Sequence, residues 1–201
     1  MSALRAAMDS DVFDVHCIRR RVGSTGLVIF ERDDILLRHR PQFEDLTLGD
    51  IDANFVAMLQ DFRNLDVRFG FITYHSPPRR KSRVRTDSAT LTRLLDDLLR
   101  VTGALPDFWI GTACMSTLRQ RHGSQIRDEL DLITKLTESY GADLDKLVLV
   151  RKAESPRVSA HPSGLTEIFY PGLSARAASN ISRPSKVGWL KTMIKHVLDL
   201  E

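Results

Sequence analysis

The run LVIFE at residues 27–31 has the length and apolar character of a buried β-strand, and VRFGFIT at residues 67–73 is a second run of this kind. Between them, apolar residues recur at the spacing of a helix: Ile51, Phe55, Leu59 and Phe62. Because two parallel strands need a connection of about a dozen or more residues, this order predicts a parallel strand pair joined by a crossover helix. We expect Gly49 and Asp50 to mark the start of that helix.

The same alternation continues to the end of the chain. Further strand candidates are DFWIG (107–111), LVLV (147–150) and TEIFY (166–170). Helical stripes lie between and after them: Leu91, Leu94, Leu95, Leu98 and Leu99, closed by Gly103; Ile126, Leu130, Ile133, Leu136 and Tyr140, closed by Gly141; and Val187, Leu190, Ile194 and Val197. Strands that alternate with helices predict a three-layer α/β/α sandwich of Rossmann-like type, with a mostly parallel sheet between two layers of helices.

Composition limits the class of protein. The chain has 201 residues, of which 42% are hydrophobic and 27% charged, so it has enough apolar content to fold. We expect a single domain over residues 27–201, preceded by an N-terminal segment (1–26) with little periodicity. No apolar stretch approaches the roughly 20 residues of a membrane span, and the acidic N-terminus does not resemble a signal peptide. With only two cysteines and no disulfide framework, we expect a cytoplasmic protein that does not associate with membranes.

The stretch VIFERDDIL (28–36) follows the first strand candidate. It resembles the first motif of the haloacid dehalogenase (HAD) superfamily, in particular the branch of small phosphatases that contains histidinol phosphatase and heptose bisphosphate phosphatase. The resemblance extends from about residue 27 to residue 180. It implies a HAD-like fold with a minimal cap or none. It also implies a site at the carboxyl ends of the strands, where ligands of open α/β sheets bind.

The resemblance assigns roles to particular residues. Glu31 stands at the position of the family's nucleophilic aspartate, and Asp33 at that of its acid/base carboxyl. FITYHS (71–76) corresponds to the second motif and places Thr73 at the phosphate-binding position. RQRHG (119–123) corresponds to the third motif, and either Arg119 or Arg121 would contact phosphate.

Two of these positions depart from the family pattern. The extra methylene of Glu31 shifts the attacking oxygen by about 1 Å, a displacement that can cost roughly a hundredfold in rate. In LVLVRKAES (147–155), Arg151 stands where the family has an aspartate ligand of Mg²⁺. A guanidinium offers no lone pair and repels a dication. We therefore expect Arg151 to lie among Glu31 and Asp33 and to replace the metal's charge. If the motif shifts by three residues, Glu154 supplies the metal ligand instead.

Three functions follow from these features. The first is a divergent HAD-like protein without a metal cofactor that binds or regulates a protein or a phosphorylated ligand. The second is a weak or altered Mg²⁺-dependent phosphatase acting on a phosphorylated small molecule. The third is a module that binds the phosphates of a nucleic acid or phosphoprotein through a basic loop. The net charge of +3 is too small to imply a polyanionic partner, so this function depends on the local clustering of basic residues. That loop contains Arg79, Arg80, Lys81, Arg83 and Arg85.

Overall fold

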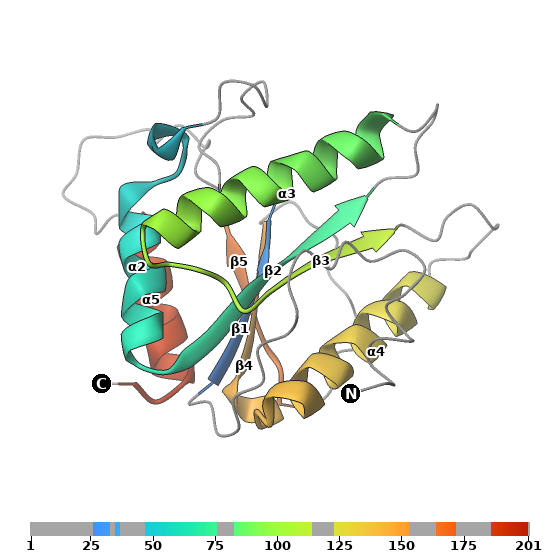
Figure 1. Cartoon of the computed structure of the whole chain (residues 1–201). Helices are drawn as coiled ribbons and strands as arrows, with labels where there is room; N and C mark the ends of the chain where they lie inside the picture. Colours follow the sequence, from blue (N-terminus) through green and yellow to red (C-terminus); the bar gives the residue numbers. More distant parts are fainter. Residues whose placement is uncertain are drawn as a thin grey trace.

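The described part of the chain has five strands and four α-helices, which alternate except that β5 follows β4 with no helix described between them (Figure 1). The computed structural model describes residues 26–32, 35–36, 47–75, 83–113, 123–152, 164–171 and 186–200, with backbone alone at 74–75, 83–89, 111–113 and 123–130. The strands are β1 (Gly26–Glu31), β2 (Val67–His75), β3 (Phe108–Ala113), β4 (Leu147–Lys152) and β5 (Thr166–Tyr170). The helices are α2 (Ala53–Asn64), α3 (Arg83–Val101), α4 (Gly123–Tyr140) and α5 (Lys186–Val197), with short 3-10 turns η2 (Leu48–Asp50) and η3 (Leu144–Lys146).

The sheet has the strand order β3-β2-β1-β4-β5, and every neighbouring pair is parallel. The predicted parallel sheet is therefore confirmed. The chain adds β2 and β3 on one side of β1 and then crosses to add β4 and β5 on the other side. The order thus reverses between β1 and β4, and in open α/β sheets such a switch point is where ligands bind.

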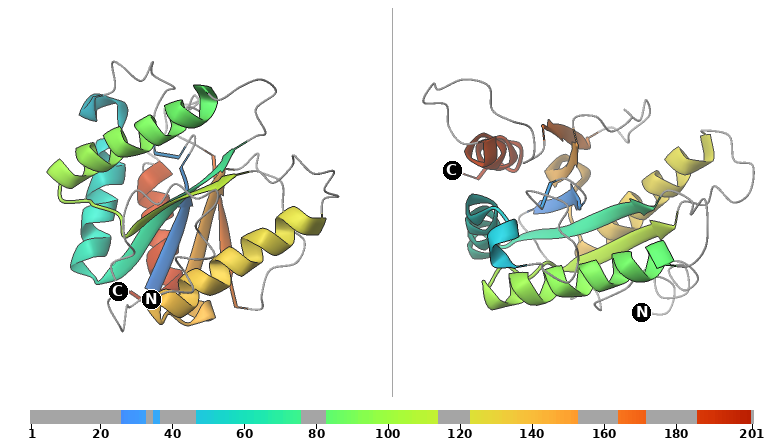
Figure 2. Two further views of the ribbon diagram at one scale, coloured as in Figure 1. Left: turned by 45° about the vertical axis from the view of Figure 1, so that its right-hand side comes forward. Right: turned by 90° about the horizontal axis from the view of Figure 1, so that it is seen from above.

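Helices cover both faces of the sheet, which confirms the three layers (Figure 2). Successive strand residues point to opposite faces. Val28 and Phe30 pack in a core cluster with α2, α3 and α5, whereas Leu27 and Ile29 pack in a second cluster with α4. Because both faces of β1 are buried, its residues from Leu27 to Phe30 are an unbroken apolar run, as expected of a central parallel strand.

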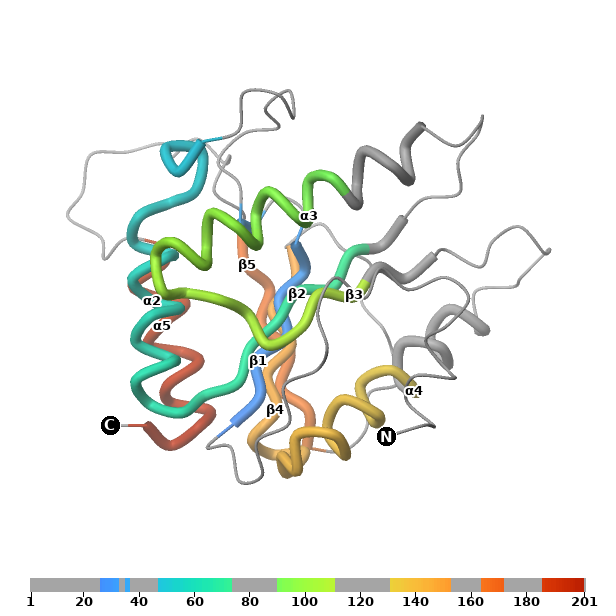
Figure 3. The backbone as a smooth tube through the Cα atoms, viewed as in Figure 1, coloured from blue at the N-terminus to red at the C-terminus, as the bar shows by residue number. Residues whose placement is uncertain are grey.

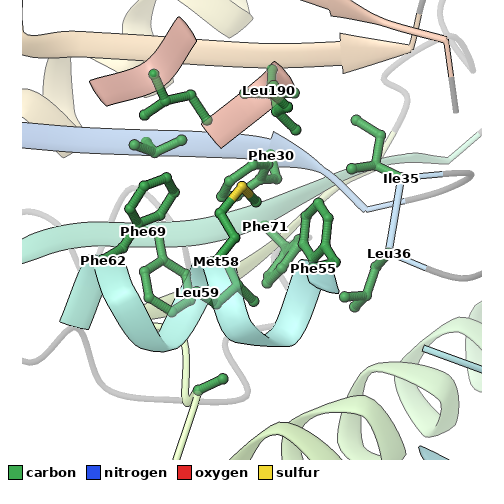
Figure 4. Close-up of a cluster of buried hydrophobic side chains, with 14 of the residues drawn as sticks. Phe30, Ile35, Leu36, Phe55, Met58, Leu59, Phe62, Phe69, Phe71 and Leu190 are labelled. Carbon is green, nitrogen blue, oxygen red and sulfur yellow. The ribbon is translucent and has the colours of Figure 1, made fainter. Parts of the chain in front are cut away.

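Aromatic rings fill much of the larger core (Figure 4). Phe30 of β1 meets Phe55 of α2 edge to face at a centroid distance of 5.4 Å and Phe71 of β2 at 5.5 Å. Phe71 also stacks on Trp109 at 4.7 Å. Such contacts hold α2 directly over β1 and β2, and this fixes where the helix begins relative to the carboxyl ends of those strands.

The start of α2 differs from the prediction. Gly49 and Asp50 belong to η2, where the Asp50 carboxylate accepts a hydrogen bond from the Thr47 backbone N–H at 2.8 Å. The helix itself is capped by Asp52, whose Oδ1 accepts from the backbone N–H of Asn54 at 2.8 Å and of Phe55 at 3.3 Å. Asp52 thus satisfies two of the donors that every helix N-terminus leaves open.

Two glycines end helices as predicted, but the basic loop needs a correction. Gly103 follows α3 with a φ of 75° and Gly141 follows α4 with a φ of 62°, the left-handed conformation that glycine adopts at little cost. In contrast, α3 already begins at Arg83, so Arg83 and Arg85 belong to a helix and not to a loop (Figure 1). The later turns of α3 can be followed as a tube in Figure 3. Residues 79–81 lie outside the described residues.

A buried carboxylate stabilises the amino ends of β2 and β3. Asp107 accepts hydrogen bonds from the Phe69 backbone N–H at 3.1 Å and from Arg68 at 3.4 Å, and it pairs with Arg63 at 2.8 Å. This network lies at the amino ends of the strands, whereas the candidate site lies at their carboxyl ends. It therefore has a structural role in positioning the strands.

On the face of the sheet that α2 also covers, α5 is tied to its neighbours by two charged contacts. Lys191 pairs with Asp61 of α2, and Lys146 pairs with Asp199, which follows α5. That contact lowers the pKa of the Asp199 carboxyl, chiefly through the hydrogen bond from Lys146.

Within the part of the chain that the structure describes, no helix combines the length and apolar character needed to cross a membrane.

Candidate functional site

The carboxyl ends of β1 and β4 bring together two residues that the sequence singled out. Strand pairing runs in register up to Phe30 and Val150, so Glu31 and Arg151 follow side by side. Both continue the alternation of residues that face α4, since Leu27, Ile29, Leu147 and Leu149 all belong to that core cluster. Glu31 and Arg151 therefore share one face at the switch point of the sheet.

Glu31 uses its carboxylate to bind the backbone of β4. Its Oε2 accepts a hydrogen bond from the Lys152 N–H at 3.0 Å. The side chain therefore bridges the two central strands immediately beyond their last paired residues. A carboxylate engaged in this way has less freedom to attack a substrate, because its position is already set by the end of β4.

Arg151 makes its described ion pair on the side away from β1. Its side chain is 5% exposed, and its Nη1 lies 3.1 Å from Oε1 of Glu167 in β5. Glu167 is not one of the partners predicted from the sequence, which were Glu31 and Asp33. Asp33 lies outside the described residues, so that half of the expectation stays a prediction. Glu31 adjoins Arg151 at the ends of the paired strands, and its expected pairing with that guanidinium also stays a prediction.

A second buried arginine lies on the opposite face of the same strand ends. Arg32 is 4% exposed, and its Nη1 donates to the Thr92 hydroxyl of α3 at 2.7 Å. Its backbone N–H donates to the Ile72 carbonyl at 2.8 Å and its carbonyl accepts from the Leu36 N–H at 3.3 Å. Arg32 thus ties the end of β1 to both β2 and α3. The sequence signal was present in the motif, where Arg32 separates Glu31 from Asp33.

Thr73 lies close to the expected position at the end of β2. It is buried and shares the face of Phe71, two residues earlier in the strand, which packs under α2 and α3. The strand continues to His75, so Thr73 is not its last residue. The phosphate-binding role of Thr73 stays a prediction.

Several predicted site residues lie outside the described part of the chain. They are the acid/base candidate Asp33, the alternative metal ligand Glu154, the phosphate-binding candidates Arg119 and Arg121, and Arg79, Arg80 and Lys81 of the basic cluster. The structure does not test their roles, and it shows Arg83 and Arg85 only as backbone within α3.

A buried tyrosine lies near the same edge of the sheet. Tyr170, the last residue of β5, is fully buried, and its hydroxyl has no hydrogen-bond partner among the residues that the structure describes. Burial, together with the nearby negative charge of Asp52, raises the pKa of Tyr170 to about 12. The side chain is therefore neutral at physiological pH and contributes an apolar ring to the core.

The described side chains do not fit a Mg²⁺ ion. Among them, no group of three or more His, Cys, Asp or Glu residues is arranged to hold a metal. Mg²⁺ takes oxygen ligands in near-octahedral geometry, and the residue at the expected ligand position is a buried cation. Arg151 and Glu167 already neutralise each other, so Glu167 offers no uncommitted negative charge to a dication.

Comparison with known proteins identifies the fold. No family model matches the sequence, and no curated protein matches it. A solved structure from Mesorhizobium loti described as a HAD-like phosphatase superposes with a TM-score of 0.61 at 12% identity, covering 92% of this chain and 93% of that one. D,D-heptose 1,7-bisphosphate phosphatase from Burkholderia thailandensis gives a TM-score of 0.43 at 12% identity, covering 75% of this chain and 94% of that one. The chain has the fold of HAD-like phosphatases.

Proposed function

We propose that this protein is a divergent HAD-fold protein that has lost Mg²⁺-dependent phosphoryl transfer and acts by binding or regulation. Its partner, on this proposal, is a protein or a phosphorylated ligand that reaches the carboxyl edge of the sheet. The observation that carries the proposal is the buried Arg151 guanidinium, paired with Glu167, at the position where the family resemblance places a metal-binding aspartate.

Physical chemistry supports this interpretation. A divalent ion placed beside a buried guanidinium is repelled strongly, because charges in a protein interior interact far more strongly than in water. Arg151 cannot lose its charge, since the guanidinium pKa is above about 12. Replacing the carboxylate ligand by arginine thus removes a metal ligand and adds a positive charge at the same position.

The state of Glu31 supports the same conclusion. A nucleophile must approach phosphorus in line with the leaving group, and its oxygen must be placed within a fraction of an ångström. Here the side chain is one methylene longer than aspartate, and Oε2 is bound by the Lys152 N–H. Both features oppose attack on a phosphate.

The test is phosphate release from an aryl phosphate and from sugar phosphates, measured with and without MgCl₂. We expect no Mg²⁺-dependent release from the wild-type protein. Release that requires Mg²⁺ and disappears in Glu31→Gln would overturn the proposal in favour of an altered phosphatase. Glu31→Gln is a suitable control because the amide oxygen can still accept from Lys152, so the fold should be retained.

Thermal melting gives an independent measurement. A metal that binds only the folded state must raise the melting temperature in proportion to its binding free energy. We expect the melting temperature of the wild-type protein to be the same with and without millimolar MgCl₂. A reproducible rise would show a metal site and would contradict the proposal.

A further inference from the structure

Two carboxylates from different strands converge on the last two residues of β4. Glu31 reaches from β1 to the Lys152 N–H at 3.0 Å, and Glu167 reaches from β5 to the Arg151 guanidinium at 3.1 Å. Since β4 lies between β1 and β5 in the sheet, the two acids flank it on the same face. Arg151 is the buried cation at the centre of this arrangement.

The pairing of Arg151 with Glu167 is diagonal across the ladder. Arg151 is registered with Phe169, whereas Glu167 is registered with Leu149, one pleat earlier. Diagonal neighbours in a sheet lie within reach of long side chains. The guanidinium therefore leans back along β4 toward β5, and the carboxylate of Glu31 occupies the end of β4 on the other side.

A buried guanidinium needs a fixed counter-charge. Desolvation of an ion costs several kcal/mol, and this cost is offset only by a well-placed partner of opposite charge. Glu167 is 12% exposed in its side chain, so this pair is largely shielded from water. Burying either charged side chain here without the other would cost several kcal/mol of folding free energy.

We infer that the Arg151 guanidinium is the resident cation of this site and that Glu167 is the positioning residue that holds it there. The inference rests on the proposed function in one respect, namely that the site operates without a metal ion. It adds that the Arg151 guanidinium supplies the positive charge that a metal ion would otherwise bring to this site. Glu167, on the edge strand β5, is the counter-ion of that guanidinium.

The experiment removes the guanidinium and supplies free cations. Arg151→Ala removes the counter-charge of the largely buried Glu167 carboxylate. We expect a drop in melting temperature on the order of 10 °C, as for a broken buried ion pair in a chain of this size. Millimolar guanidinium chloride or MgCl₂ should then restore several degrees in the variant and nothing in the wild-type protein.

The matched control is the double variant Arg151→Ala/Glu167→Gln, which keeps the side-chain volume at 167 but removes its charge. We expect this variant to lose the response to cations, and Arg151→Ala/Glu167→Asp to retain part of it. If Arg151→Ala responds to neither cation, or if the double variant responds equally, the inference is wrong. A purely packing role for Arg151 predicts no response in any variant.

A second measurement covers the case in which Arg151→Ala does not fold. Glu167→Gln alone should lower the melting temperature, and Glu167→Asp should lower it less. Adding Arg151→Gln to Glu167→Gln should recover part of the loss, because no buried charge is then left without its counter-ion. Equal melting temperatures for Glu167→Gln and the wild-type protein would overturn the inference.

These outcomes are separable from the proposed function. Mg²⁺-dependent phosphatase activity in the wild-type protein would refute the loss of catalysis and leave the coupling of Arg151 to Glu167 to be judged on the variants. Failure of the variants to show coupling would refute the role of Glu167 and leave the activity result unchanged.

Discussion

Oε2 of Glu31 accepts a hydrogen bond from the backbone N–H of Lys152, 121 residues later in the chain, at a distance of 3.0 Å. The pairing of β1 with β4 has its last registered residues at Phe30 and Val150. The side chain of Glu31 thus extends the connection between the two central strands past the point where their pairing ends. This contact makes Glu31 part of the scaffold at the carboxyl ends of β1 and β4.

A first prediction concerns this contact. Glu31→Ala removes the acceptor and should lower the free energy of unfolding by about 1–2 kcal/mol, since hydrogen bonds to charged groups contribute about 1.5–3 kcal/mol and Glu31 is only partly buried. Glu31→Gln keeps an acceptor oxygen and should cost less than about 1 kcal/mol. Urea denaturation of the three proteins measures both differences. Equal losses in the two variants would show that the charge, and not the hydrogen bond, matters.

A second prediction concerns the buried arginine on the other face. Thr92→Val preserves shape but removes the hydroxyl that receives the Arg32 guanidinium at 2.7 Å. Leaving a buried charged donor without that acceptor should cost about 1–3 kcal/mol. Because Arg32 anchors the end of β1, hydrogen exchange at the Arg32 and Leu36 amides should also accelerate.

Thr92→Ser retains a hydroxyl and serves as the control for this prediction. It should keep slow exchange at both amides and lose little stability. If Thr92→Val leaves exchange at Arg32 and Leu36 unchanged, the contact does not hold the end of β1 in place.

A third prediction concerns the opposite edge of the sheet. Asp107→Ala removes the carboxylate that binds Arg63, Arg68 and the Phe69 backbone N–H. Breaking a buried ionic network by deleting one partner typically costs about 3–5 kcal/mol, and Arg68 is almost fully buried. Asp66→Asn is the matched control, because that carboxylate is half exposed and pairs with the same Arg68. Its loss should cost less than about 1 kcal/mol.

The outcome of this third comparison is read from chemical denaturation. The two carboxylates contact a common arginine, so a difference between them isolates the effect of burial at Asp107. Similar losses for Asp107→Ala and Asp66→Asn would contradict the structural role assigned to the buried network.

The order of strands and helices could be predicted because burial on two faces leaves a clear pattern. LVLV in β4 and LVIF in β1 are continuous apolar runs, and both strands have a neighbour on each side in the sheet. The start of α2 was predicted incorrectly because Asp50 and Asp52 lie only two residues apart and an aspartate at either position could cap the helix. Only the extended backbone at Ile51, which ends η2 and precedes the helix, distinguishes them.

The partner of Arg151 could not be found from the sequence. Glu167 follows sixteen residues later, beyond a segment whose length does not fix the register of β5 against β4. One signal was available, since Glu167 alternates with the apolar Ile168 and must therefore face the other side of the sheet. That face is the one on which Arg151 is buried, but this became apparent only from the strand order.

A fourth prediction concerns pH and Tyr170. Its hydroxyl is buried and has no hydrogen-bond partner within the described part of the chain, and its pKa rises from 10.0 to about 12 on folding. Between these values the unfolded chain has lost the proton while the folded chain still holds it. Stability should therefore be fully present below about pH 10 and fall as pH rises toward 12, by at most about 2.7 kcal/mol for two pKa units.

Tyr170→Phe isolates this contribution, because it removes the titrating hydroxyl and keeps the ring in the core. At neutral pH the variant should be at least as stable as the wild-type protein, since an unpartnered buried hydroxyl costs about 1–3 kcal/mol. From pH 10 to pH 12 its stability should fall less steeply than that of the wild-type protein. Tyr140→Phe is the control, because its hydroxyl already contacts the Asp107 carbonyl at 3.5 Å. Parallel loss of stability in the wild-type protein and Tyr170→Phe would show that other groups govern alkaline unfolding.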